Sequence, residues 1–144
     1  MKQSPDMVQD VLDFHKKFDQ YVGDLPHWPP FDVLRMRIRL VNEEWGEFNT
    51  AIAGEDITQI ADAVADLMYV LIGMMNAMGV DMRPIWIAVQ RANMAKEGGG
   101  SREDGKILKP EGWMEPPLKM ILALQGEDWH QKPFENPIPV ESEA

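Results

Sequence analysis

Apolar residues recur at alternating intervals of three and four along much of the chain, which is the spacing of one face of an α-helix. Four stretches have this pattern, at residues 7–22, 31–52, 56–78 and 81–96. The first two are separated by residues 23–30, which include three prolines. Prolines remove amide donors and restrict the residues before them. The pattern therefore predicts an all-α fold of four helices, with a turn between the first and the second.

Residues at the ends of these stretches fit helix caps. Glu55 and Asp56 begin the third stretch, where acidic side chains suit the helix dipole. Gly79 follows the same stretch as an expected C-terminal cap. Asp81 is an expected N-cap for the fourth helix, and Pro84 is tolerated in the first turn. These caps support the predicted boundaries.

The chain is less regular after the fourth stretch. Residues 97–106 are rich in glycine and polar side chains, which predicts a mobile loop. Residues 118–124 form a short apolar stretch after two prolines and predict one more helix. Residues 127–144 are rich in proline and acids, which predicts an extended or disordered tail. We therefore expect one all-α domain over residues 1–126 and a tail over residues 127–144.

Composition narrows the possible functions. The chain has 144 residues and a formal net charge of −10 at pH 7, which suits a single core and argues against binding to nucleic acid or anionic membranes. An acidic protein that handles phosphates needs cations. The chain contains no cysteine, so disulfides and thiolate metal sites are excluded. Its first ten residues do not resemble a signal peptide, and the expected location is the cytoplasm.

The third predicted helix is apolar on nearly all sides. Between residues 60 and 78 its polar side chains are Asp62, Asp66, Tyr69 and Asn76. A membrane span is not expected, because Asp66 would lie at its centre without a basic partner in the segment. Such a helix belongs in a core or an oligomer interface. We therefore expect a homodimer or a homotetramer.

Carboxylates gather on the second and third helices. Asp62 and Asp66 are four residues apart and Glu44 and Glu47 are three apart, so each pair shares a helix face. Converging acids repel one another unless cations neutralise them, and oxygen ligands without histidine or cysteine favour Mg²⁺, Mn²⁺ or Ca²⁺. The alternative for Glu43, Glu44 and Glu47 is a solvated helix face.

A di-iron carboxylate bundle is not expected. That class of site requires Glu-x-x-His pairs on its helices. The chain has three histidines, and none of them lies on the two helices that carry the acids: His15, His27 and His130.

The segment Glu-Glu-Trp-Gly-Glu at residues 43–47 resembles the Glu-Glu-x-x-Glu signature of the MazG-like and phosphoribosyl-ATP pyrophosphohydrolase superfamily. The likeness covers about residues 8–118 and includes segments 62–70, 93–96, 104–106, 109–110 and 116–117. One departure stands out. The superfamily usually has Glu-x-x-Asp on the third helix, and here Ala63 occupies the glutamate position. Asp62 lies on the adjacent edge of the same helix face.

The resemblance implies a four-helix MazG-like bundle completed by oligomerisation, which cleaves a nucleotide between its α and β phosphates. It implies two or three Mg²⁺ ions, which Mn²⁺ is able to replace, bound to carboxylates and phosphates. We assign Glu44, Glu47, Asp62 and Asp66 to the metal. Glu43 either holds a further ion or orients the attacking water, and Glu47 together with Glu43 is assigned to catalysis.

Substrate contacts follow from the same resemblance. Asn93 and Lys96 lie three residues apart near the end of the fourth helix and are expected to contact phosphate and the sugar or base. For Lys96 the alternative is a cation favoured by the helix dipole. Lys106 and Lys109 either close over the phosphates or are solvated. Trp28 is the preferred candidate for stacking on the base.

His27 and Trp45 are further candidates for stacking on the base, but Trp45 fits the apolar stripe of the second helix better.

The leading functional hypothesis is hydrolysis of a canonical or damaged nucleoside triphosphate, ribo or deoxy, to the monophosphate and pyrophosphate. This reaction would serve nucleotide pool sanitation or nucleotide balance. The second is hydrolysis of phosphoribosyl-ATP. The third, from a different class, is a catalytically silent helical module that binds a nucleotide or docks a partner.

Overall fold

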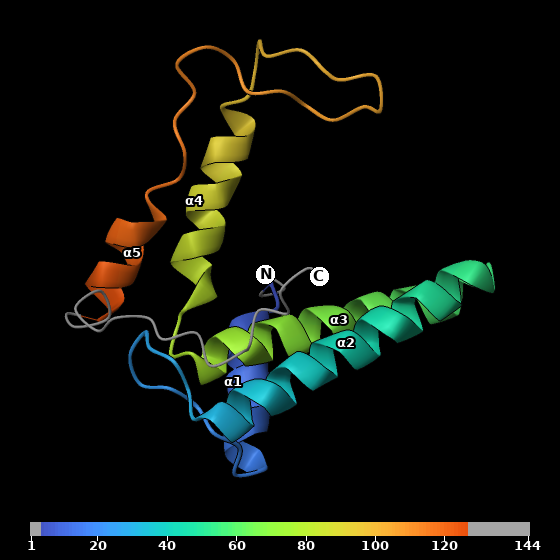
Figure 1. Ribbon diagram of the computed structural model, residues 1–144, viewed down its shortest axis with the longest axis vertical. Helices are drawn as coiled ribbons and strands as arrows, with labels where there is room; N and C mark the ends of the chain where they lie inside the picture. Colours follow the sequence, from blue (N-terminus) through green and yellow to red (C-terminus); the bar gives the residue numbers. More distant parts are fainter. Residues whose placement is uncertain (1–3, 127–144) are drawn as a thin grey trace, which may run out of the picture.

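The computed structural model describes residues 4–126 and contains five α-helices in that range (Figure 1). They are α1 (Met7–Lys17), α2 (Phe31–Ala53), α3 (Ile57–Ala77), α4 (Met82–Met94) and α5 (Leu118–Gln125). Within residues 4–126 the only extended pairing is an isolated bridge between Ser101 and Ile107. The prediction of an all-α fold is confirmed. The predicted tail, residues 127–144, lies outside the described residues.

Helices α2 and α3 form a long hairpin and lie side by side (Figure 1). The side chain of Asp56 begins α3 by accepting hydrogen bonds from the backbone N–H groups of Thr58, at 2.9 Å, and Gln59, at 3.4 Å. Ala51 and Ala63 are buried, with exposed fractions of 5% each. Small side chains let two helices approach closely, because little side-chain volume separates their backbones. The hairpin therefore holds α2 and α3 in close contact.

The first helix is shorter than predicted. The apolar spacing extends to residue 22, but α1 ends at Lys17. Asp19 adopts the left-handed conformation, with a φ of 52°, and the N–H of Gln20 donates to the carbonyl of His15 at 2.8 Å. These features define a Schellman cap, which usually has glycine where this chain has Asp19. The prediction of a helix to residue 22 is wrong because the periodicity continues past this cap.

A glycine contact fixes the loop before α2 against the end of α3. Gly79 ends α3 with a φ of 69°, and a Cβ atom there would overlap the carbonyl of Leu25. The N–H of Gly23 donates to the carbonyl of Asn76 at 2.9 Å, and the N–H of His27 donates to that of Met78 at 3.0 Å. The loop therefore depends on glycine at residue 79, where any side chain would be both strained and too large.

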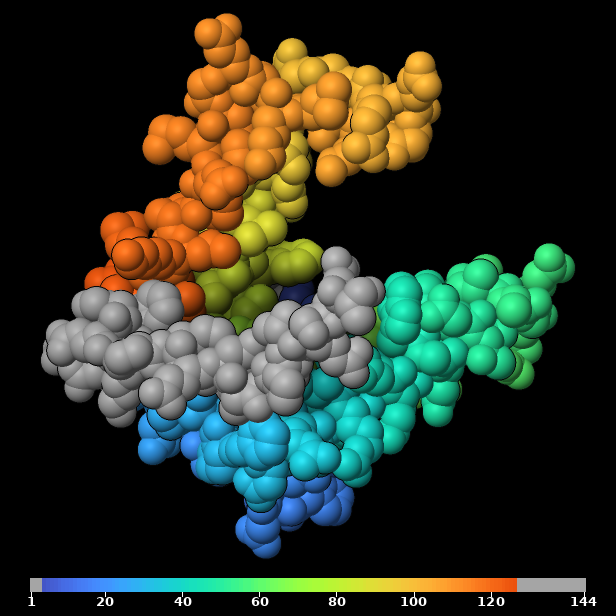
Figure 2. All heavy atoms as spheres, in the orientation of Figure 1, coloured from blue at the N-terminus to red at the C-terminus, as the bar shows by residue number. Residues whose placement is uncertain are grey.

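Helices α4 and α5 form a second part of the chain. They pack against each other, while α1 packs against α3 (Figure 1). Gln125 joins them: its Oε1 accepts from the N–H of Asp81 at 2.8 Å, and its Nε2 donates to the Asp81 carbonyl at 3.0 Å. The segment after α4 and the far ends of α2 and α3 form separate lobes (Figure 2).

Many large apolar side chains are exposed in the described chain. By length and composition α3 would be able to cross a membrane, and 11% of its most apolar window is buried. This is weak evidence for a membrane span, because α3 packs along α2 and carries Asp62 and Asp66. All five helices of the described chain carry exposed apolar residues, and those on α2, α3 and α4 include Trp45, Ile52, Val64, Met68, Leu71, Trp86 and Ile87.

A buried basic pair lies among the first three helices. His15 on α1 and Arg37 on α2 are 1% and 3% exposed, and both side chains approach Gly73 on α3. The Arg37 guanidinium donates to Gln20 Oε1 at 3.1 Å. Burial, with a smaller contribution from the Arg37 charge, lowers the pKa of His15 to about 4. His15 is therefore neutral at pH 7 and must gain a charge in acid.

We expect the free energy of unfolding to fall by about 2 kcal/mol between pH 7.5 and pH 5, because unfolded His15 binds a proton that the folded chain excludes. A lowered histidine pKa stabilises the fold above the unfolded pKa and loses that effect as the pH falls towards the folded one. Urea unfolding at a series of pH values measures the slope.

His15→Gln should flatten this pH dependence, while His27→Gln, a change at an exposed histidine, should leave it intact. An equal slope in the wild type and His15→Gln would show that other groups cause the acid sensitivity.

Candidate active site

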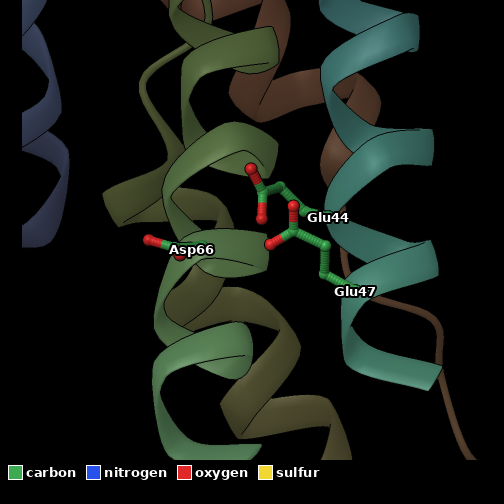
Figure 3. A group of neighbouring side chains, drawn as sticks. All are labelled: Glu44, Glu47 and Asp66. Carbon is green, nitrogen blue, oxygen red and sulfur yellow. The ribbon is translucent and has the colours of Figure 1, made fainter. Parts of the chain in front are cut away.

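Three carboxylates from α2 and α3 converge. Glu44, Glu47 and Asp66 each place one carboxylate oxygen within 4.8 Å of the others. Glu44 and Glu47 extend from α2 towards α3 (Figure 3). The spacing of three residues puts the two glutamates on one face of α2, and the hairpin places Asp66 opposite them. The structure thus brings together three of the four residues that the sequence assigns to a metal.

Glu44 is the most enclosed of the three. Its Oε2 atom is buried and has no hydrogen-bond partner within the described residues. Burial raises the pKa of Glu44, and the negative charges of Glu47 and Asp66 raise it further. A buried carboxylate oxygen without a donor costs free energy unless a proton or a cation satisfies it. The donor set, all oxygen and all acidic, fits a hard divalent cation.

Glu43 and Asp62 lie beside this cluster. Both are exposed, and the charge of each also raises the pKa of Glu44, after the larger effects of burial, Glu47 and Asp66. Neither belongs to the group of converging oxygens found among residues 4–126. Ala63 stands where the superfamily usually has the glutamate of Glu-x-x-Asp, and it is buried. The roles of Glu43 and Asp62 at the site stay predictions.

A second polar cluster forms where α4 ends. Lys96 Nζ donates to Asn93 Oδ1 at 2.9 Å, as the three-residue spacing suggests. Lys96 and Lys109 place their Nζ atoms 5.7 Å and 4.4 Å from the centre of the Trp113 ring. Sequence reasoning did not single out Trp113, because it lies in an irregular segment without periodicity. Its proximity to Lys109 in the chain was the available signal.

The glycine-rich segment contains a turn. The N–H of Arg102 donates to the carbonyl of Lys106 at 2.8 Å, and the Arg102 side chain pairs with Asp104. The backbone N–H of Lys106 donates to Asp104 Oδ1 at 3.2 Å, while the Lys106 side chain is exposed. This turn occupies the segment expected to be a loop. The predicted contact of Lys106 with phosphate stays a prediction.

Trp28 and Trp45, the two tryptophans considered for stacking on the base, differ in their surroundings. Trp28 lies in the proline-containing loop before α2 and is 44% exposed. Trp45 follows the apolar stripe of α2 in the sequence, but it is 54% exposed in this chain and stacks on Phe48, with ring centres 5.5 Å apart. The glutamates Glu44 and Glu47 immediately precede these two rings in the sequence. Successive residues of a helix point in different directions, so this adjacency does not place the rings in the site. Trp45 is exposed where the sequence favoured a place in the apolar stripe.

The acids and the lysines lie on separate parts of the chain. Glu44, Glu47 and Asp66 belong to the hairpin of α2 and α3, whereas Lys96 and Lys109 lie beyond the far end of α4 (Figure 1). Helix α4 packs mainly against α5. One chain therefore does not bring the predicted metal ligands and the predicted phosphate ligands into one site.

The fold and the converging carboxylates place the protein in the class of all-α proteins with an acidic site of the metal-binding kind. More specifically, the chain belongs to the phosphoribosyl-ATP pyrophosphohydrolase family, whose sequence model matches residues 11–93. The resemblance in the carboxylate motif is thereby confirmed, and the chain is an enzyme of the pyrophosphohydrolase type. A search of curated proteins finds no match.

The family match defines which residues share the family's region. It includes the acids of α2 and α3 together with Asn93, and it ends before Lys96, Lys106 and Lys109. The family is typically metal-dependent, and the cluster of Glu44, Glu47 and Asp66 supplies oxygen ligands of the required kind.

In metal-free buffer, Glu44→Gln should raise the melting temperature by about 3 °C, because it removes a half-buried charge that its neighbours repel. The raised pKa of Glu44 means that the folded chain holds this proton more tightly, so metal-free stability falls as pH rises through that pKa. Thermal unfolding followed by circular dichroism measures the effect.

Added Mg²⁺ should stabilise the wild type and have little effect on Glu44→Gln. The control is Glu103→Gln, which removes the same charge from an exposed position outside the cluster. If both variants respond to Mg²⁺ as the wild type does, Glu44 is not a ligand.

Proposed function

We propose that the chain is a Mg²⁺-dependent nucleoside triphosphate pyrophosphohydrolase, which converts an NTP or dNTP to the monophosphate and pyrophosphate. The observation that supports this most strongly is the buried, unpartnered Oε2 of Glu44 within the cluster of Glu44, Glu47 and Asp66. The chain carries this cluster within the region that matches the pyrophosphohydrolase family.

Glu44, Glu47 and Asp66 would hold Mg²⁺, with Asp62 beside them, and Mn²⁺ is able to replace it. A bound divalent cation would neutralise the triphosphate, polarise the α-phosphoryl group and lower the pKa of the attacking water. Glu43 either holds a further ion or orients that water. The water oxygen bonds to the α-phosphorus, the bond from that phosphorus to the bridging oxygen breaks, and pyrophosphate leaves.

The remaining assigned residues serve recognition. Asn93 and Lys96 are already joined by a hydrogen bond and would contact the phosphates and sugar together. Lys106 and Lys109 would add positive charge around the departing pyrophosphate. Trp28, which is 44% exposed, would stack on the base. In a chain with a net charge of −10, such a local group of cations is what an anionic substrate requires.

Phosphoribosyl-ATP is the second candidate substrate, because the matching family is described by that activity. Both reactions break the same kind of phosphoanhydride bond, so the carboxylates serve either one. We favour nucleoside triphosphates because Ala63 replaces the usual glutamate and because the chain extends beyond the family match. The third candidate is a silent binding module, which has no catalytic use for the enclosed carboxylate of Glu44.

We propose further that the active protein is a homodimer or a homotetramer. The exposed apolar side chains of α2, α3 and α4 need a cover, and a second copy supplies one of matching composition. The acids and lysines lie apart in one chain, so a partner copy would bring Lys96 and Lys109 to the carboxylates. The site would then lie between subunits.

Pyrophosphate should appear when the protein is incubated with Mg²⁺ and a panel of ribo- and deoxynucleoside triphosphates. Asp66→Asn should lower kcat by at least about 100-fold, because it removes a charge that stabilises the reacting phosphates through the metal. Coupled pyrophosphate detection measures the rate. Asp24→Asn, an exposed change in the loop before α2, is the control and should retain activity.

Release of pyrophosphate from phosphoribosyl-ATP alone would select the second candidate. Absence of turnover with every substrate, in a folded protein, would favour the silent module. Full activity of Asp66→Asn would contradict the metal assignment.

Mixing two inactive variants tests the shared site. Asp66→Asn mixed with Lys96→Ala, after unfolding and refolding together, should recover about a quarter of the wild-type activity, because half of the dimers are mixed and each has one intact site of two. Mixing Asp66→Asn with Glu47→Gln should recover none, since both changes lie in one cluster. Lack of recovery in the first mixture would place each site within one subunit.

A further inference from the structure

Two lysines from different segments approach the ring of Trp113. Lys109 Nζ is 4.4 Å from the ring centre and Lys96 Nζ is 5.7 Å from it. Ammonium groups at these distances are attracted by the negative face of an aromatic ring, and tryptophan has the strongest such attraction. One side chain thus holds cations from the end of α4 and from the loop that follows it.

The ring itself is fixed to the helix. Trp113 Nε1 donates a hydrogen bond of 2.7 Å to the carbonyl of Ala92, in the last turn of α4. The backbone N–H of Trp113 donates to the carbonyl of Pro110 at 3.2 Å and closes a turn just after Lys109. The side chain is half-buried. The indole therefore has a defined position relative to both Asn93 and Lys96.

The arrangement orders side chains that would otherwise be free to move. Two lysines repel each other, and long lysine side chains lose entropy when they are held in one place. The shared ring opposes that repulsion, and Lys96 is held further by Asn93 Oδ1 at 2.9 Å. Lys109 Nζ also lies 3.6 Å from Glu115 Oε1, with which it forms an ion pair. Both cations are thus held at one ring before any anion arrives, which lowers the cost of binding one.

We propose that Trp113 is a positioning residue that holds Lys96 and Lys109 for the pyrophosphate portion of the substrate. The inference rests on the proposed function, in which these lysines bind phosphates. Trp113 acts through the lysines and does not itself contact the reacting atoms. The ligand it serves is a polyphosphate anion, since two ammonium groups held at one ring suit a group with several negative charges.

Calorimetric titration with inorganic pyrophosphate in Mg²⁺ tests this directly on the whole protein. Trp113→Leu should weaken pyrophosphate binding about tenfold, because it removes both ring contacts and the Nε1 anchor. Trp113→Phe keeps an aromatic face and loses the anchor, so it should lie between the wild type and Trp113→Leu. Met114→Leu, at the adjacent and 81% exposed position, should bind as the wild type does.

A double-mutant cycle separates positioning from a merely structural role. Lys109→Gln should weaken pyrophosphate binding in the wild-type background and much less in the Trp113→Leu background. In Trp113→Leu the ring no longer holds Lys109 in place, so little is left for the second change to remove. In turnover, Trp113→Leu should raise KM more than it lowers kcat. Circular dichroism and melting temperature establish that each variant is folded.

The outcomes distinguish this inference from the proposed function. If the wild type hydrolyses triphosphates and Trp113→Leu binds pyrophosphate unchanged, the inference is wrong and the function stands. If the wild type binds pyrophosphate through Trp113 but hydrolyses no triphosphate, the function is wrong and the positioning role stands. Additive losses for Trp113→Leu and Lys109→Gln would overturn the inference, as would a Trp113→Phe variant as weak as Trp113→Leu in a folded protein.

Discussion

The close packing of α2 against α3 is the constraint on which the site depends. Like charges do not approach one another unless something else holds them, and here the apolar hairpin does so. Two carboxylates at 4.8 Å repel by about 1 kcal/mol in water, and more where water is partly excluded. Full burial of a single large apolar side chain contributes about 1.5–3 kcal/mol. The hairpin can therefore hold the acids together, and a cation would convert the repulsion into attraction.

The same packing explains why the acids are unequal. Glu44 lies deeper than Glu47 and Asp66, so burial acts first on its carboxylate and the neighbouring charges add to it. Exposed acids satisfy their oxygens with water, whereas Glu44 Oε2 has no such opportunity within the described chain. Because it is the most enclosed of the three, Glu44 is the carboxylate that most needs a cation.

The helices and their caps could be predicted because they depend on local signals. Asp81 caps α4 and Gly79 ends α3 as expected, and Asp56, expected only as an acid that suits the helix dipole, is the N-cap of α3. The end of α1 could not be predicted in the same way. Glycine usually occupies the left-handed position at the end of a helix, and here that position is Asp19, so the sequence lacks the usual marker. The acids of the site were predictable from spacing on two helices, since helical periodicity determines which side chains share a face.

Contacts between distant segments could not be predicted from helical periodicity or cap residues. Trp113 meets Lys96 because the chain after α4 folds back on the helix end, and nothing in the spacing of apolar residues encodes that return. The separation of α4 from the hairpin is likewise a matter of tertiary packing. Sequence patterns therefore identified the candidate ligands, but not which of them lie together in one chain.

The carboxylates and the cations lie in different parts of the chain, and only the carboxylates lie within the family match. The family match ends at residue 93, so it contains the carboxylates and excludes Lys96, Lys109 and Trp113. In the proposed function, the acids would bear on which bond is broken, because they would address the phosphates through a metal whatever base or sugar is attached. The cations after α4 would bear on how tightly a polyphosphate is held. A silent binding module would need the cations alone. Burial and like charges raise the pKa of Glu44, so its ionised form is costly without a counter-ion. The proposed metal-dependent reaction would give that cost a physical reason.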